Sequence, residues 1–321
     1  MGRDGLIVTW NDPPHDSSPS ESTPTMPRRH KIPRPPRTAT TQAREVYETD
    51  LTDAQWRILE PLLPPRPGGG RPPKTERREV VNAILYQLRT GCAWDLLPHD
   101  FPPPGTVYDS FSQWRRDGTI ARIHEALRPR VREASEHDPE PSAACLDSQS
   151  VKTTEIGGIK GFDAGKKVKG RKRHIVVETL GLLIAVVVTP ANVQDYHGAK
   201  PALLRAKDRS PGLEVVWVDG IYEKEWLIAW ARGECGWELQ VVKRTDKEKG
   251  FKVVPKRWVV ERTFGWLGRY RRLSKDYERL PETSEAMIQM AMIHIMLRRL
   301  EPTCQYPLSS RNGGMEISQA A

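Results

Sequence analysis

The sequence has few cysteines, and their positions exclude two common ways of stabilising a protein. The four cysteines are Cys92, Cys145, Cys235 and Cys304. They lie far apart, and no group of cysteines and histidines has the spacing of a zinc site. We therefore expect reduced thiols in a cytoplasmic protein, rather than disulfide bonds or structural zinc.

The sequence also lacks a long hydrophobic run. The longest apolar stretch, residues 180–188, is too short to cross a bilayer. It is rich in β-branched residues, so it predicts a buried strand. The N-terminus has no apolar core of the kind that a signal peptide carries. We expect no membrane partner.

Apolar residues are scarce overall, at 37% of the chain, because the two ends contain almost none in a regular pattern. Residues 1–46 are rich in Pro, Ser, Thr and Arg, and residues 302–321 are similar. Neither end can bury enough apolar surface to offset the entropy lost on ordering. Both are predicted to be disordered, which leaves enough chain for two domains between them.

Basic residues exceed acidic ones. The chain has 50 Lys and Arg against 41 Asp and Glu, a formal net charge of +9. This balance favours a polyanionic partner, nucleic acid before membrane. The alternative is a basic surface that is simply solvated.

Residues 47–135 are predicted to form a helical unit. Apolar residues recur at helical spacing in four segments, which begin near Thr52, Thr75, Thr106 and Ile120. Three short helices with basic residues near the third are typical of a helix-turn-helix fold that binds duplex DNA. The alternative is a helical bundle that serves only as a scaffold or dimer element.

After a linker at residues 136–142, the pattern predicts an α/β domain over residues 143–301. Runs typical of strands fall at 143–147, 172–179, 182–189, 214–218 and 238–242, and helical runs at 197–207, 222–234, 256–270 and 283–300. Three strands come first, and the last two alternate with helices. This order predicts a mixed five-stranded sheet flanked by helices.

Three acidic residues stand in settings that favour a metal site. Asp147 and Asp219 each end an apolar strand-like run, and Glu261 lies in a helical run. Mg²⁺ prefers oxygen ligands, and a pair of such ions stabilises both the attacking and the leaving oxygen of a phosphoryl displacement. Each acid could instead be an ordinary exposed residue, but a carboxylate joined to a buried strand is costly unless it is paired or bound to metal.

Helical spacing relates Glu261 to its neighbours. Arg257 lies at i−4, so it shares a helix face with Glu261, and Gly265 and Gly268 lie at i+4 and i+7. Arg257 and Glu261 form either a solvated ion pair or a site in which Arg257 contacts a DNA phosphate beside a metal-binding Glu261. In the second case the glycines would let DNA approach closely.

The segment 160–173 is the most strongly basic part of the chain. Seven of its fourteen residues are Lys or Arg, and its three glycines predict a flexible loop. Such a loop suits the phosphate backbone of DNA, although a solvated loop is the alternative. The predicted DNA-binding residues are Lys166, Lys167, Lys169, Arg171, Lys172 and Arg173 in this segment, with Arg257 and Arg269 near Glu261.

Several short motifs point to a known family. They are LTDAQW at 51–56, GCAW at 91–94, LLPHDFPP at 96–103, TVY at 106–108, DSQSVK at 147–152, GFDAGKKVKGRKRH at 161–174, TPANVQD at 189–195, WVVERTF at 258–264 and KDYE at 275–278. With these motifs, residues 47–300 resemble a DDE transposase of the bacterial insertion-sequence five group.

The resemblance implies an RNase H-like catalytic domain in which Asp147, Asp219 and Glu261 are the catalytic, metal-binding triad. It implies Mg²⁺-dependent cleavage at insertion-sequence ends and strand transfer by the freed 3′-hydroxyl, with two Mg²⁺ ions that Mn²⁺ can replace. The implied partners are double-stranded DNA, as terminal inverted repeats and target, and a second copy of the chain. The implied location is the bacterial cytoplasm, with the nucleoid.

The sequence departs from the family pattern near two of the three acids. In the wider group the signature around the glutamate is Tyr, Arg, Glu and Lys, and here Val254 and Gly268 occupy the Tyr and Lys positions. Ile221 stands after Asp219 where glycine is usual. Two alternatives therefore remain: an inactive or domesticated protein that binds terminal repeats, and a stand-alone structure-specific nuclease.

Overall fold

The computed structural model describes residues 44–65, 75–155, 157–242 and 258–303. All of them fall within one compact unit. Most of the two ends that were predicted to be disordered lies outside the described residues, as does Arg257. None of the described helices, α8 included, is long and apolar enough to cross a membrane.

The first part of the described chain is helical, as predicted. Its elements are α1 (Asp53–Leu59), η1 (Glu60–Leu62), α2 (Arg77–Thr90), η2 (Trp94–Leu96), α3 (Pro104–Arg116) and α4 (Thr119–Ala134). Thr52 starts α1 with a capping box, because its hydroxyl accepts the Gln55 N–H and the Gln55 side chain accepts the Thr52 N–H. The helix-turn-helix fold itself stays a prediction.

A mixed sheet follows, with one strand more than the five predicted. Its strands are β1 (Ala143–Lys152), β2 (Gly161–Asp163), β3 (Val168–Glu178), β4 (Leu183–Pro190), β5 (Val215–Val218) and β6 (Glu238–Val241). β3 runs antiparallel to β1, β2 and β4, whereas β5 is parallel to β1 and to β6. The sequence pattern does not predict β2, because this strand is three residues long and contains Gly and Asp, which are rare in strands.

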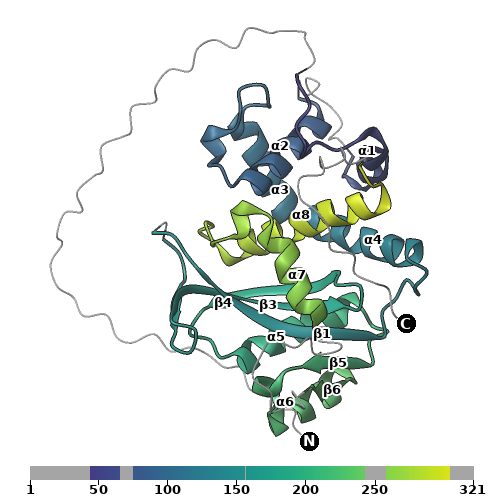
Figure 1. Cartoon of the computed structure of the whole chain (residues 1–321), viewed down its shortest axis with the longest axis vertical. Helices are drawn as coiled ribbons and strands as arrows, with labels where there is room; N and C mark the ends of the chain where they lie inside the picture. The colour runs from purple at the N-terminus through teal and green to yellow at the C-terminus, as the bar shows by residue number, and fades with distance from the viewer. Residues whose placement is uncertain (1–43, 66–74, 156, 243–257, 304–321) are drawn as a thin grey trace, which may run out of the picture. The chain divides into compact units, whose positions relative to one another are not determined.

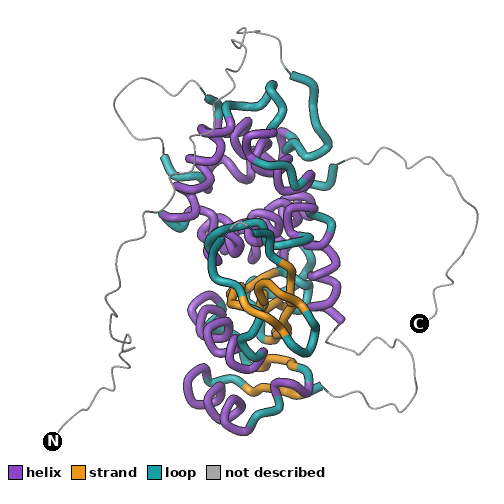
Figure 2. Tube along the Cα trace, turned by 90° about the vertical axis from the view of Figure 1, so that its left-hand side faces the viewer, coloured by secondary structure: helices purple, strands orange, loops and turns teal. Residues whose placement is uncertain are grey.

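Helices cover both faces of the sheet (Figures 1 and 2). They are α5 (Asp195–Arg209), α6 (Glu225–Trp230), α7 (Trp258–Gly268) and α8 (Pro281–Leu300), with the short turns η3 (Gly220–Tyr222), η4 (Ala231–Cys235) and η5 (Arg271–Leu273). One buried apolar cluster joins the sheet to α5 and α6. A second joins the opposite face of the sheet to α7 and α8 and extends among α1–α4.

The helical part and the sheet therefore share a core across the predicted linker. α8 is buried along most of its length and contacts both α4 and β4. An ion pair between Arg132 of α4 and Glu178 of β3, both buried, crosses the same junction. Residues 47–135 and 143–301 differ in sequence pattern but are packed against each other.

Candidate metal and nucleic-acid site

Strand register brings the two predicted aspartates to the same level of the sheet. β1 and β5 are parallel neighbours, and Cys145 pairs with Trp217. Asp147 and Asp219 each come two residues later. The parallel pairing ends at Cys145 and Trp217, so both aspartates follow the last paired residues of neighbouring strands, which are about 5 Å apart where they pair.

Both aspartates belong to the face of the sheet that α7 covers. Cys145 is buried in the cluster that includes α7 and α8, and Trp217 packs against the same cluster. Side chains alternate along a strand, so residues two further on return to that face. Asp219 follows β5 with an extended backbone, φ −86° and ψ 176°, so the alternation continues to it.

Backbone N–H groups orient both carboxylates. Asp147 Oδ1 accepts the N–H of Ser148 at 2.7 Å, and Asp219 Oδ1 accepts the N–H of Ile221 at 2.9 Å, which makes Asp219 the cap of η3. Ile221 is not among the described non-glycine residues with positive φ. Isoleucine in place of the usual glycine therefore introduces no backbone strain here.

A tyrosine that sequence analysis missed lies close to the aspartates. Tyr222 is fully buried in the core on the α5 side. Burial first, and then the charges of Asp147, Asp195 and Asp219, raise the pKa of its hydroxyl well above the usual value, while the Ser148 hydroxyl opposes this shift. The hydroxyl therefore stays protonated. No sequence signal marked it, because a single tyrosine in a turn is common.

Glu261 lies on the exposed side of α7, the helix that crosses β1 and β3 (Figure 1). The Thr263 hydroxyl fixes the helix by donating to the Gly181 carbonyl at 2.8 Å. Gly181 has φ +81°, and a Cβ there would lie 2.8 Å from both the Thr263 hydroxyl and the Trp266 ring. Only glycine permits this close approach.

The carboxylates form an oxygen-only donor set, which suits a hard divalent cation such as Mg²⁺. Asp147 and Asp219 each follow a paired position on neighbouring strands, while Glu261 lies on the helix that covers their face. Among the described residues, no three His, Cys, Asp or Glu side chains are grouped closely enough to hold a metal ion. The three-carboxylate site therefore stays a prediction.

Comparisons with known proteins decide the family. Residues 138–296 match the family described as transposase DDE domain, and residues 51–124 match the putative transposase of IS4/5 family. A Burkholderia cepacia protein named insertion element IS402 uncharacterized 16.2 kDa protein is 32% identical over 114 residues, which cover 33% of this chain and 76% of that protein. The chain belongs to the DDE transposase family.

A second Burkholderia cepacia relative is named putative transposase for insertion sequence element IS402. It is 34% identical over 129 residues, which cover 38% of this transposase and 60% of the relative. The DDE transposase domain implies an RNase H-like fold, and enzymes of this family transfer phosphoryl groups in nucleic acids, generally with divalent metal ions. The mixed α/β sheet described above agrees with that fold.

The basic segment of the transposase is a β-hairpin, not the flexible loop that its glycines predicted. β2 and β3 pair through Gly161 and Gly170, with a turn between them. A Cβ at Gly170 would lie 2.0 Å from the Val151 carbonyl oxygen, so this glycine is there for close strand packing. The glycines alone predict hinges, because the strand that packs against Gly170 lies elsewhere in the sequence.

The hairpin divides the predicted DNA-binding residues into two groups. Lys166, Lys167 and Lys169 are exposed. The Lys166 ammonium donates to the Ser148 carbonyl at 3.3 Å, which places it next to the first predicted aspartate. Arg269, after α7, is also exposed.

The second group, Arg171, Lys172 and Arg173, is buried and bonded within the protein. Arg171 pairs with Asp276 at 3.2 Å and donates to the carbonyls of Ile159, Glu278 and Arg279. These contacts tie the hairpin to the segment between α7 and α8. The direct DNA contact predicted for Arg171 would require the loss of this ion pair and these three hydrogen bonds.

Lys172 and Arg173 are held just as firmly. Lys172 pairs with Asp195 at 2.7 Å and with Asp163 at 3.2 Å. Arg173 donates to the Leu273 carbonyl at 2.8 Å, and burial lowers its pKa to about 10 although the Asp276 charge opposes this. The Arg173 side chain remains charged at neutral pH, and both side chains make their contacts inside the fold.

Proposed function

We propose that this transposase cleaves DNA at the ends of an insertion sequence and transfers the freed 3′ ends into target DNA. The observation that supports the proposal most is that Asp147 and Asp219 each follow, by two residues, the paired Cys145 and Trp217 of the parallel strands β1 and β5. These two residues belong to the face of the sheet that α7 covers. This arrangement supports a reaction that needs carboxylates gathered at one place on a nucleic-acid backbone.

In this proposal Asp147, Asp219 and Glu261 hold two divalent cations, Mg²⁺ first. When bound, the ions supply charge stabilisation for the attacking and leaving oxygens at phosphorus. The N–H groups of Ser148 and Ile221 orient the two aspartates.

The exposed Lys166, Lys167 and Lys169 contact DNA phosphates, as do Arg257 and Arg269. We assign Arg171, Lys172 and Arg173 to positioning the hairpin, because their side chains are buried and already bonded. A Cβ at Gly265 or Gly268 would contact nothing in the described part of the chain. Gly265 and Gly268 therefore leave this exposed side of α7 without side chains, and we propose that a DNA strand lies there.

The test uses the purified full chain, DNA that carries its terminal inverted repeats, and Mg²⁺. We expect nicking and joining by the wild type. Asp147→Asn or Glu261→Gln should abolish both products while DNA affinity persists, because each removes one ligand and leaves the basic surface intact. Unchanged cleavage in either variant would show that the substituted residue is not a required metal ligand.

Two ends must be brought together for transposition, so we propose a dimer in the DNA complex, which light scattering of the complex can measure. One alternative is a protein that binds repeat ends without chemistry. Specific end binding with no product in Mg²⁺ or Mn²⁺ would favour that alternative. Hydrolysis without joining would indicate a nuclease.

A further inference from the structure

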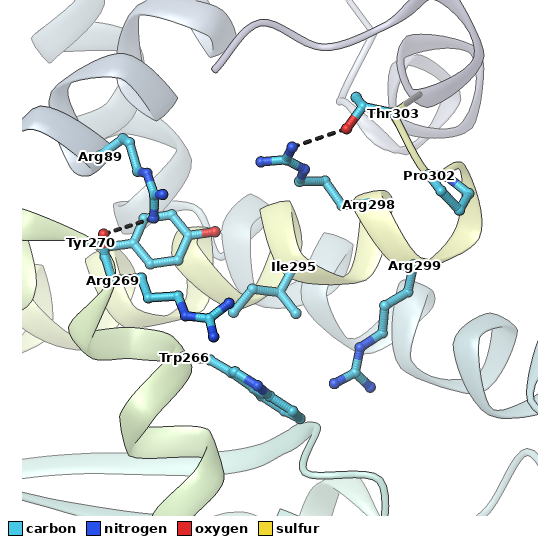
Figure 3. Close-up of a pocket in the computed structure, with 9 residues that line it drawn as sticks. All are labelled: Arg89, Trp266, Arg269, Tyr270, Ile295, Arg298, Arg299, Pro302 and Thr303. Atoms are coloured by element: carbon cyan, nitrogen blue, oxygen red, sulfur yellow. Dashed lines mark hydrogen bonds between the residues drawn. The ribbon is translucent and has the colours of Figure 1, made fainter. Parts of the chain in front are cut away.

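A cavity of about 450 Å³ lies where α2, the end of α7 and the end of α8 meet (Figure 3). Its charged lining residues are Arg89 on α2, Arg269 just after α7, and Arg298 and Arg299 in the last turn of α8. Trp266 and Tyr270 add aromatic walls, and no acidic residue is among the described residues that line it. We call this cavity the arginine pocket.

Neutral groups, not carboxylates, hold these side chains. Arg89 Nη1 donates to the Arg269 carbonyl at 2.7 Å, and its guanidinium lies 5.7 Å from the centre of the Tyr270 ring (Figure 3). Arg298 Nη2 donates to the Thr303 hydroxyl at 2.9 Å. Such partners orient a guanidinium without cancelling its charge.

Trp266 has the same effect on two further arginines. The Arg299 guanidinium lies 4.4 Å from the centre of the Trp266 ring, and the Arg262 guanidinium lies 4.9 Å from it. Arg299 also reaches the Leu180 carbonyl at 3.4 Å. Cation–π contacts attract an arginine but leave its positive charge available to an anion.

Several other arginines in the described part of the chain are paired with carboxylates. They are Arg44 with Asp50 and Glu79, Arg78 with Asp53, Arg132 with Glu178, Arg171 with Asp276, Arg205 with Glu285, Arg209 with Glu125, and Arg272 with Glu278. Within the described ranges, none of the four arginines of the pocket has such a pair. The contrast indicates that their charge is left for a ligand.

Crowded like charges repel one another, and the effect is visible around the pocket. Burial, followed by the charge of Arg262, lowers the pKa of Arg299, although the charge of Glu178 opposes this shift. Burial, followed by Arg298 and Arg89, lowers the pKa of His294, the hydrogen-bond partner of the Tyr270 hydroxyl, to about 3. A bound anion would relieve this repulsion.

We propose that the arginine pocket binds phosphodiester groups of the DNA strand that reaches α7. This rests on the proposed function, because it takes that substrate to be DNA. The planar fork of arginine matches phosphate oxygens, and several arginines together suit a ligand with more than one negative charge. The end of α7 lies about 10 Å beyond Glu261 along the helix axis, so one strand can follow the helix from the carboxylate to the pocket.

The test measures DNA affinity without metal, so that chemistry plays no part. Fluorescence anisotropy with a labelled duplex in EDTA gives the affinity of the full chain over a range of salt concentrations. Arg298→Gln and Arg269→Gln change exposed side chains and should each weaken binding roughly tenfold. Each should also lower the salt slope by about one.

Arg232→Gln is the matched control, because Arg232 is an exposed arginine on η4, in the part of the chain that packs with α5 and α6. It should leave affinity and slope unchanged. Equal losses in the control, or unchanged DNA binding in the double variant Arg269→Gln and Arg298→Gln, would overturn the proposal. One further result would overturn the proposal. If the double variant reduced the ability of inorganic phosphate to compete with DNA, but bound DNA as tightly as the wild type, the pocket would be a site for free phosphate.

The outcome is separable from that of the proposed function. If the wild type makes no cleavage product but the pocket variants lose affinity, the pocket assignment stands and the chemistry fails. If the wild type cleaves DNA and the pocket variants bind normally, the chemistry stands and the pocket assignment fails.

Discussion

Two basic regions of this transposase differ in how their charge is used. The hairpin at residues 160–173 concentrates seven basic residues in one stretch of sequence, yet Arg171, Lys172 and Arg173 are buried and bonded within the protein. The arginine pocket gathers residues from three distant parts of the chain and leaves them without carboxylate partners among the described residues. A high density of charge in a sequence is therefore a poor measure of charge available to a ligand.

The largest effect should come from the buried side of this comparison. Arg171→Gln would leave Asp276 buried without its cation and three carbonyls without their donor. We expect the free energy of unfolding to fall by about 3–5 kcal/mol, measured by urea denaturation. Arg298→Gln, in the pocket, should change it by no more than about 0.5 kcal/mol. Equal losses would remove the distinction between the two regions.

A smaller effect, with a characteristic pH dependence, is expected at Asp163 in the hairpin. Burial alone would raise its pKa, but hydrogen bonds from Ser150, the Lys166 N–H and Lys172, with the charge of Lys172, lower it to about 2. Asp163→Asn should cost about 2 kcal/mol at neutral pH through the loss of charged hydrogen bonds.

That cost should shrink in acid. A carboxylate with a lowered pKa stabilises the folded state above its unfolded pKa, and the contribution is lost as pH falls through the folded value. The stability difference between wild type and Asp163→Asn should therefore narrow as pH falls from about 4 toward about 2. A difference that is constant across that range would show that the carboxylate charge contributes nothing.

The smallest change in stability is expected on the exposed part of the hairpin. Lys169→Gln should leave the melting temperature unchanged but weaken DNA binding and lower its salt slope by about one, because one phosphate contact is lost. Lys172→Gln is the comparison variant. Because Lys172 is buried and paired with Asp163 and Asp195, its main effect should be a lower melting temperature. If Lys169→Gln leaves the slope unchanged, the exposed lysines of the hairpin do not contact DNA.

Local patterns were enough to predict most of the elements. Apolar spacing predicted the four N-terminal helices, and five of the six strands lie where alternation and β-branched runs placed them. The capping box at Thr52 is an example, because every group that forms it lies within four residues. β2 was not predicted. Its three residues pair with residues 168–170 of β3, which lie before the start of the predicted strand at residue 172.

Long-range contacts could not be predicted in the same way. Nothing in the sequence near Gly170 shows that Val151 would lie against it, and nothing near Tyr222 shows that three aspartates would affect its hydroxyl. The arginine pocket depends on where α2, α7 and α8 end relative to one another. Such placements follow from packing of whole elements, which residue spacing does not encode.

By itself, the sequence determined the family, the basic character of the protein and the three acids whose surroundings favour a metal site. The tertiary structure decided which basic side chains are buried and which are exposed. Asp147 and Asp219 each follow by two residues the pair Cys145–Trp217 of the parallel strands β1 and β5, and Arg171 is buried because β3 lies inside the sheet. Burial and register depend on the whole fold, so the chemical environment of a residue cannot be read from its neighbours in sequence.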